Sequence, residues 1–138
     1  MEILLRCFPI ILACFLSSSL QAKEQISIGH PILGTWVYQN EACTETYTYS
    51  RDGIRHVTAA DEIVRAKFQI EKFDGKPNVY LVRDEVIFDN GKPDCQGDSS
   101  VMVGSVVDLY IVMDDRPKRI SFCLDMALKE CFGPFNKK

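Results

Sequence analysis

The side chains that could catalyse a reaction are few, and the histidines limit that chemistry most. The chain has two histidines, His30, which precedes a proline, and His56, which lies in a run typical of a β-strand. Nucleophilic catalysis needs a base within hydrogen-bond reach of a serine or cysteine, and a third group that orients the base. A lone histidine on a strand is more commonly a surface or packing residue. We therefore expect no enzymatic activity and no catalytic residues.

One short segment looks like a nucleophile loop. Cys95-Gln96-Gly97-Asp98-Ser99 resembles the loop that carries the serine of trypsin-like proteases, and His56 lies upstream of it. In that family a glycine follows the serine and shapes the oxyanion hole, whereas Ser100 follows here. Because a triad is defined by geometry rather than by a short string, we interpret residues 96–99 as a polar turn.

Asp84 is the acid whose position points most toward a function. It shares one face of an expected strand with large apolar residues, namely Tyr80, Val82, Val86 and Phe88. An acid on that face points toward the core, where buried charges are usually paired. Asp84 therefore either pairs with Arg55 or Arg65, or orients a bound ligand. Glu85 points to the opposite face of the strand, so the two carboxylates cannot flank one bond.

No metal or cofactor is expected. Asp89, Asp94 and Asp98 lie in one loop, but calcium takes six to eight oxygens, and the EF-hand spacing with its final glutamate is missing. We interpret this loop as solvated and held by Cys95. The chain also has no P-loop and no dinucleotide fingerprint.

The first residues are typical of a secretory signal peptide. Arg6 precedes the apolar run 7–16, and the small and polar stretch 17–22 ends at Ala22 before a charged residue. The run is too short to span a bilayer. We expect residues 1–22 to be removed and residues 23–138 to form one domain, exported to the periplasm or the extracellular space. Lipidation at Cys14 is the alternative, because residues 11–14 loosely match a bacterial lipobox.

Export determines how the remaining cysteines are interpreted. They are Cys43, Cys95, Cys123 and Cys131. An even number in a small exported domain indicates two disulfides. A zinc site fits poorly, because the sequence has no C-x-x-C pair and few histidines.

Short alternating segments separated by turn signals predict an all-β fold, either a barrel or a sandwich. The expected strands are 32–38, 43–50, 54–58, 63–73, 79–89, 101–113 (one strand, or two meeting near Gly104) and 119–124. In the last of these, Ile120, Phe122 and Leu124 are expected to face inward. Residues 125–131 fit either a helical turn or a frayed hairpin.

Composition excludes several classes of protein. The chain has 138 residues, 46% hydrophobic and 25% charged, which is typical of a single globular domain. A formal net charge of −3 is too small to indicate nucleic acid or an anionic membrane as the partner.

Gly34-Thr35-Trp36 and the aromatic strand Thr46–Ser50 that runs into Asp52-Gly53 resemble the lipocalin-like, or calycin, barrels of small exported bacterial proteins. The resemblance implies a small antiparallel up-and-down β-barrel of about eight strands. In that family the G-x-W tryptophan closes one end of the barrel and a basic side chain stacks on it. Arg119 and Lys129 are the candidates for that role here, while the family's T-D-Y motif is absent.

The meander topology predicts the disulfide pairing. In such a barrel the loop between strands one and two lies at the same end as the loop between strands five and six. We therefore expect Cys43–Cys95, and Cys123–Cys131 across a short turn.

Two functions remain. In the first, the barrel binds an apolar or amphipathic small molecule, with Tyr47, Tyr49, Phe68, Tyr80 and Asp84 lining the site. In the second, the barrel is filled and its loops bind a protein, as an inhibitor or as part of an envelope assembly. We expect a monomer that binds no nucleic acid.

Overall fold

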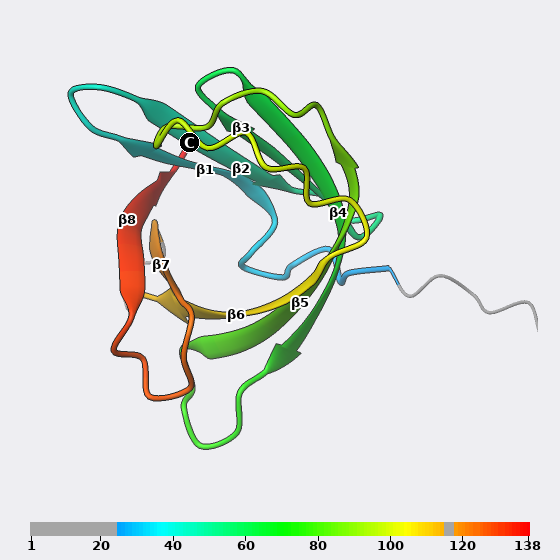
Figure 1. Ribbon diagram of the computed structural model, residues 1–138. Helices are drawn as coiled ribbons and strands as arrows, with labels where there is room; N and C mark the ends of the chain where they lie inside the picture. Colours follow the sequence, from blue (N-terminus) through cyan, green and yellow to red (C-terminus); the bar gives the residue numbers. More distant parts are fainter. Residues whose placement is uncertain (1–24, 115–117) are drawn as a thin grey trace, which may run out of the picture.

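The computed structural model describes residues 25–114 and 118–138 (Figure 1), so the expected signal segment 1–22 and Cys14 lie outside the described residues. Eight antiparallel strands follow one another around a closed barrel, in which β1 pairs with both β2 and β8. The strands are β1 (Gly34–Gln39), β2 (Thr44–Tyr49), β3 (Ile54–Ala59), β4 (Glu62–Lys72), β5 (Val79–Asp89), β6 (Val106–Met113), β7 (Arg119–Cys123) and β8 (Cys131–Lys137). The expected all-β, up-and-down barrel is confirmed.

The alternating sequence pattern explains the two faces of the wall. In β4, Val64, Ala66 and Phe68 are buried, and the residues between them are exposed. Successive side chains of a strand point to opposite faces, so one set fills the barrel and the other meets solvent.

No helix among the described residues is long and apolar enough to cross a membrane.

The meander divides the connections between two ends of the barrel. We call one end the loop end; it carries residues 40–43, 60–61, 90–105 and 124–130 and the strand residues next to them. We call the other the closed end; it carries residues 50–53 and 73–78, the connection between β6 and β7, and the segment 25–33 before β1. In Figure 1 that segment, drawn in blue to cyan, runs across the barrel before joining β1.

Trp36 lies buried at the closed end, as its position in the first strand predicts. Its Nε1 donates a hydrogen bond to the carbonyl oxygen of Ile32 at 2.8 Å. Lys137 of β8 crosses above, with Nζ 5.0 Å from the indole centroid and 3.0 Å from the carbonyl oxygen of Pro31, to which it donates. A Cβ added at Gly34, whose φ is +118°, would lie 3.1 Å from Lys137 Cε. The expectation of Arg119 or Lys129 on the tryptophan was therefore wrong.

Two further differences concern the strands near the C-terminus. Residues 101–105 belong to a loop, and the strand begins only at Val106, because Gly104 adopts a positive φ of 86° at the turn. The eighth strand is formed instead by Cys131–Lys137. The sequence does not predict this strand, because Gly133 and Pro134 interrupt the alternation of apolar and polar residues. Residues 124–130 are the connection of the β7–β8 hairpin, and Leu124 is exposed rather than facing inward.

Aromatic rings fill the interior between β1, β2, β7 and β8. Tyr47 stacks on Phe135 with ring centroids 4.8 Å apart and meets Phe122 edge-on at 5.1 Å. The Tyr38 ring also packs on Phe135, with the ring centroids 5.4 Å apart. Edge-to-face and offset ring pairs stabilise a core beyond the area that they bury. This half of the barrel is a packed core.

Candidate functional site

The barrel interior holds one ion pair, between Arg55 and Asp84, among the described residues. Arg55 Nη2 lies 2.9 Å from Asp84 Oδ2, and the two side chains are 11% and 1% exposed. They come from β3 and β5, with β4 between them. The β4 residue that pairs with Arg55 is Ala66, whose methyl group leaves room for the guanidinium to reach Asp84. Of the two partners expected for Asp84, Arg55 is confirmed.

Arg65 points away from this pair because it lies between the buried Val64 and Ala66 on β4, and Phe88 points away because the β4–β5 register shifts between Arg65 and Ala66. A β-bulge adds a residue to one strand and turns the following side chains to the other face. Phe88 is consequently 37% exposed, and the Arg65 guanidinium lies 4.7 Å from its ring centroid on the outer wall. The expectation that Phe88 shares the inner face with Asp84 was wrong.

Several polar atoms of this cluster lack a hydrogen bond. Among the described residues, Tyr49 Oη, Arg55 Nε and Asp84 Oδ1 are buried without a hydrogen bond of normal geometry, although the Tyr49 hydroxyl lies close enough to the Arg55 guanidinium to interact with it. Burial raises the pKa of Asp84, against the lowering effect of Arg55. Burial also raises the pKa of the Tyr49 hydroxyl above its ordinary value. Buried polar groups are usually satisfied by protein, water or ligand, so this cluster has unused capacity to bind a polar group.

The five expected ligand-binding residues divide between two places. Tyr49, Phe68 and Asp84 lie together in the interior, where the Tyr49 and Phe68 rings meet edge-on at 5.0 Å. Tyr47 is half-buried above them, with the Arg55 guanidinium 5.5 Å from its ring centroid and its hydroxyl donating to Glu45. Tyr80 lies apart, at the closed end against His30.

Among the residues that the structure describes, two hollows lie at or near the closed end. One of about 240 Å³ is lined by Trp36, Tyr80, Met113 and Arg119, with others. The second, of about 1080 Å³, is a groove between residues 25–30 and the ends of β4 and β5. Drug-sized ligands usually occupy enclosed pockets of roughly 300–1,000 Å³. Neither hollow opens at the Arg55–Asp84 pair.

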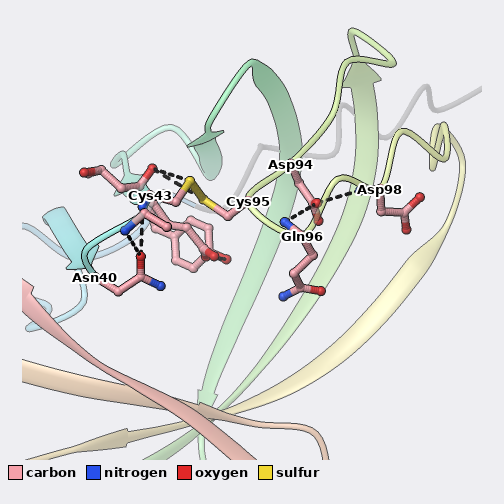
Figure 2. The surroundings of a disulfide bond; sticks show 10 residues. Asn40, Cys43, Asp94, Cys95, Gln96 and Asp98 are labelled. Atoms are coloured by element: carbon pink, nitrogen blue, oxygen red, sulfur yellow. Dashed lines mark hydrogen bonds between the residues drawn. A yellow bond between two sulfur atoms is a disulfide. The ribbon is translucent and has the colours of Figure 1, made fainter.

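The loop end is held by two disulfides, and the expected pairing is confirmed. Cys43 of the β1–β2 loop is bonded to Cys95 of the β5–β6 loop, and Cys123 to Cys131 across the β7–β8 hairpin. Figure 2 shows the first bridge beside Asn40, whose Oδ1 accepts hydrogen bonds from the amides of Ala42 and Cys43. This end therefore has a defined shape although it is built from loops.

The aspartates of the β5–β6 loop shape the loop itself. Asp94 Oδ1 accepts from the amides of Gln96 and Asp98, as Figure 2 shows, and Asp98 Oδ1 accepts from Ser100. Asp89 accepts from Gly91 and Met102. Residues 96–99 thus form a polar turn, and among residues 25–114 and 118–138 no cluster of three or more potential metal ligands is present.

Exposed apolar side chains concentrate at the loop end, a feature that alternation in the sequence does not predict. Of the described large apolar residues that are exposed, only Ile28 lies elsewhere. The others are Ile63, Ile87, Phe88, Val101, Met102, Val103, Val106, Leu124, Met126 and Phe132. The sequence feature that could have indicated this surface is the apolar run 101–103, which is followed by a glycine. The sequence pattern assigned this run to a strand.

The candidate residues of a nucleophilic site do not come together. His56 is exposed on the outer face of β3, opposite Thr48 and Arg65. Ser99 is exposed in the β5–β6 loop, and within the described part of the chain no hydrogen bond joins Ser99 to His56.

Comparisons of this chain with protein-family models, curated proteins and solved structures found no match.

Proposed function

We propose that this chain is an exported β-barrel protein that binds another protein through its loop end. The observation that carries the proposal is the concentration of exposed apolar side chains there. Val101, Val103, Val106, Leu124 and Met126 are each more than half exposed. Soluble proteins seldom expose apolar side chains together except where they bind a partner.

The packing of the interior supports binding by the loops over binding inside the barrel. A barrel of eight strands is just wide enough to be filled by side chains or to hold one small ligand. Here Trp36, Tyr49, Phe122 and Phe135 are all at most 2% exposed, and the half-buried Tyr47 stacks on Phe135. A ligand of ordinary size would have to displace packed aromatic rings.

We further propose that the chain is lipocalin-like and secreted after cleavage following Ala22. The burial of Trp36 at the closed end beneath Lys137 supports the first inference, because it matches the role of the G-x-W tryptophan in that family. The two disulfides support the second, because disulfides persist in oxidising compartments.

A small polar or amphipathic molecule in the interior is the second candidate function. The buried polar atoms of Tyr49, Arg55 and Asp84 favour it, because each of those without a hydrogen bond of normal geometry could still bind a polar group of the ligand. This function uses the barrel interior and leaves the loop end without a role.

Native mass spectrometry of the protein purified from its own host tests both functions. We expect a protein adduct that is lost in Val103→Ser and in Met126→Ser and is retained in Ile28→Ser. All three variants remove one exposed apolar side chain, but Ile28 lies outside the loop end. A small-molecule adduct lost in Asp84→Asn, or a protein adduct indifferent to Val103 and Met126, would contradict the proposal.

A further inference from the structure

We infer that the partner of the loop end presents a basic surface with apolar side chains among its lysines and arginines. This inference rests on the proposed function and specifies the chemistry of the partner. It follows from how the charges of the chain are distributed between the two ends of the barrel.

Carboxylates predominate at the loop end. They are Glu41, Glu45, Asp61, Glu62, Glu85, Asp89, Asp94, Asp98, Asp125 and Glu130, against the basic groups of Arg65, Lys92 and Lys129. The closed end has the opposite balance among the described residues, with Arg51, Lys72, Lys76, Lys118, Arg119, Lys137 and Lys138 against Asp52, Glu71, Asp74 and Asp114. The small net charge of the chain therefore conceals a strong separation of charge.

The carboxylates of the loop end affect the pKa of Glu62, the first residue of β4. Its pKa is raised by partial burial and then by the charges of Asp89, Asp94, Asp98 and Glu45. A carboxyl group whose ionisation is opposed by its neighbours marks a place that attracts positive charge.

Three of these carboxylates remain available to a partner. Asp89, Asp94, Asp98 and Asp125 accept hydrogen bonds from amides of their own loops. By contrast, Glu41, Asp61 and Glu130 are exposed, and the described structure gives their carboxylates no hydrogen bond or ion pair. They come from the β1–β2, β3–β4 and β7–β8 connections, which lie at the same end of the barrel as the exposed apolar side chains of residues 101–103 and 124–126.

The same charges argue against a lipid surface as the occupant. Apolar loop tips can insert into a membrane, but the anionic lipids of biological membranes attract basic segments and repel acidic ones. A basic protein surface matches both the apolar tips and the acidic side chains at the same end of the barrel. Charge complementarity of this kind sets specificity and the rate of encounter.

The test uses two amphipathic peptides of equal length with leucine at the same positions and either lysine or glutamate at the others. Fluorescence anisotropy measures their binding to the full, oxidised protein. We expect the lysine peptide to bind at least about tenfold more tightly than the glutamate peptide, and its affinity to fall as salt is raised. Equal binding of both peptides, or binding of neither, overturns the inference.

A matched pair of double variants locates the effect. Glu41→Gln/Asp61→Asn neutralises two loop-end carboxylates, and Glu71→Gln/Asp74→Asn makes the same changes at the closed end. We expect the first to weaken the lysine peptide several-fold and the second to leave it unchanged. Co-sedimentation with phosphatidylglycerol vesicles in preference to peptide binding would assign the loop end to a membrane instead. Should the charge inference fail while a host protein adduct still depends on Val103, the proposed function stands.

Discussion

At the scale of single residues, the interior shows how a charge is accommodated in a small barrel. Arg55 and Asp84 lie on strands separated by β4, and Ala66 between them leaves space for the contact. Burial disfavours the charged form of Arg55, but Tyr49 and Asp84 raise its pKa overall, so it stays protonated. The pair is therefore a fixed feature of the fold.

Breaking this pair is expected to be costly. Arg55→Met or Asp84→Leu should each lower the free energy of unfolding by about 3–5 kcal/mol, because either leaves the other buried group of the pair without its partner. The double variant Arg55→Met/Asp84→Leu should recover much of that loss. Urea denaturation followed by circular dichroism measures all three. A double variant no more stable than the single ones would contradict this account.

The Asp84 carboxyl also predicts the sign of a pH dependence. Its folded pKa lies above the ordinary value of 3.8, since burial outweighs Arg55, so ionisation is harder in the folded state. Its contribution to stability is fully present below 3.8 and is lost as pH rises through the folded pKa. The stability of the wild-type protein minus that of Arg55→Met/Asp84→Leu should therefore fall between acidic and neutral pH. A difference that rises with pH would contradict the assignment.

Trp36 gives a second test at this scale. Trp36→Ala should cost about 3–5 kcal/mol, because it removes a fully buried side chain and leaves a cavity. Trp36→Phe should cost less, since it loses the hydrogen bond to Ile32 but keeps most of the buried area. The sole tryptophan should emit at short wavelength in the folded wild-type protein, and a fully quenchable, red-shifted emission would place it in water.

At the scale of elements, the sequence predicted most strands because alternation is strong where one face is buried. β4 and β5 were predicted within one residue at each end, and the meander then gave both disulfides. β8 was not predicted because Gly133 and Pro134 interrupt the alternation. Lys137, which lies on this strand, was therefore not considered as the basic residue that covers Trp36. The exposed apolar residues 101–103 were assigned to a strand, since an apolar run alone does not distinguish a core strand from a binding loop.

The two disulfides are expected to contribute unequally. Cys43–Cys95 closes a separation of 52 residues and Cys123–Cys131 one of 8. In the chain-entropy model, replacing the first pair by serine should cost about 4 kcal/mol and replacing the second about 2.5 kcal/mol. Urea denaturation of the two double-serine variants measures the difference, and peptide mapping without reduction verifies the pairing. Recovery of Cys43 linked to Cys123 would contradict both the pairing and the strand order.

At the scale of the whole molecule, the separation of charge has a consequence for self-association. The loop end exposes apolar side chains such as Val103 and Met126, which would favour contact between two copies. Two loop ends that approach each other also bring their carboxylates together, and like charges oppose that contact. We expect the wild-type protein to be a monomer for this reason.

Neutralising the available carboxylates should therefore change the oligomeric state. Glu41→Gln/Asp61→Asn/Glu130→Gln removes repulsion and keeps the apolar tips, so we expect concentration-dependent dimers in analytical ultracentrifugation. Adding Val103→Ser and Met126→Ser to that variant should restore the monomer, whereas Glu71→Gln/Asp74→Asn alone should not produce dimers. High salt should promote association of the wild-type protein in the same direction, because it screens the exposed charges. A triple variant that stays monomeric at all concentrations would mean that the apolar tips are too dispersed to form one interface, and the loop-end binding surface would then have to be smaller than proposed.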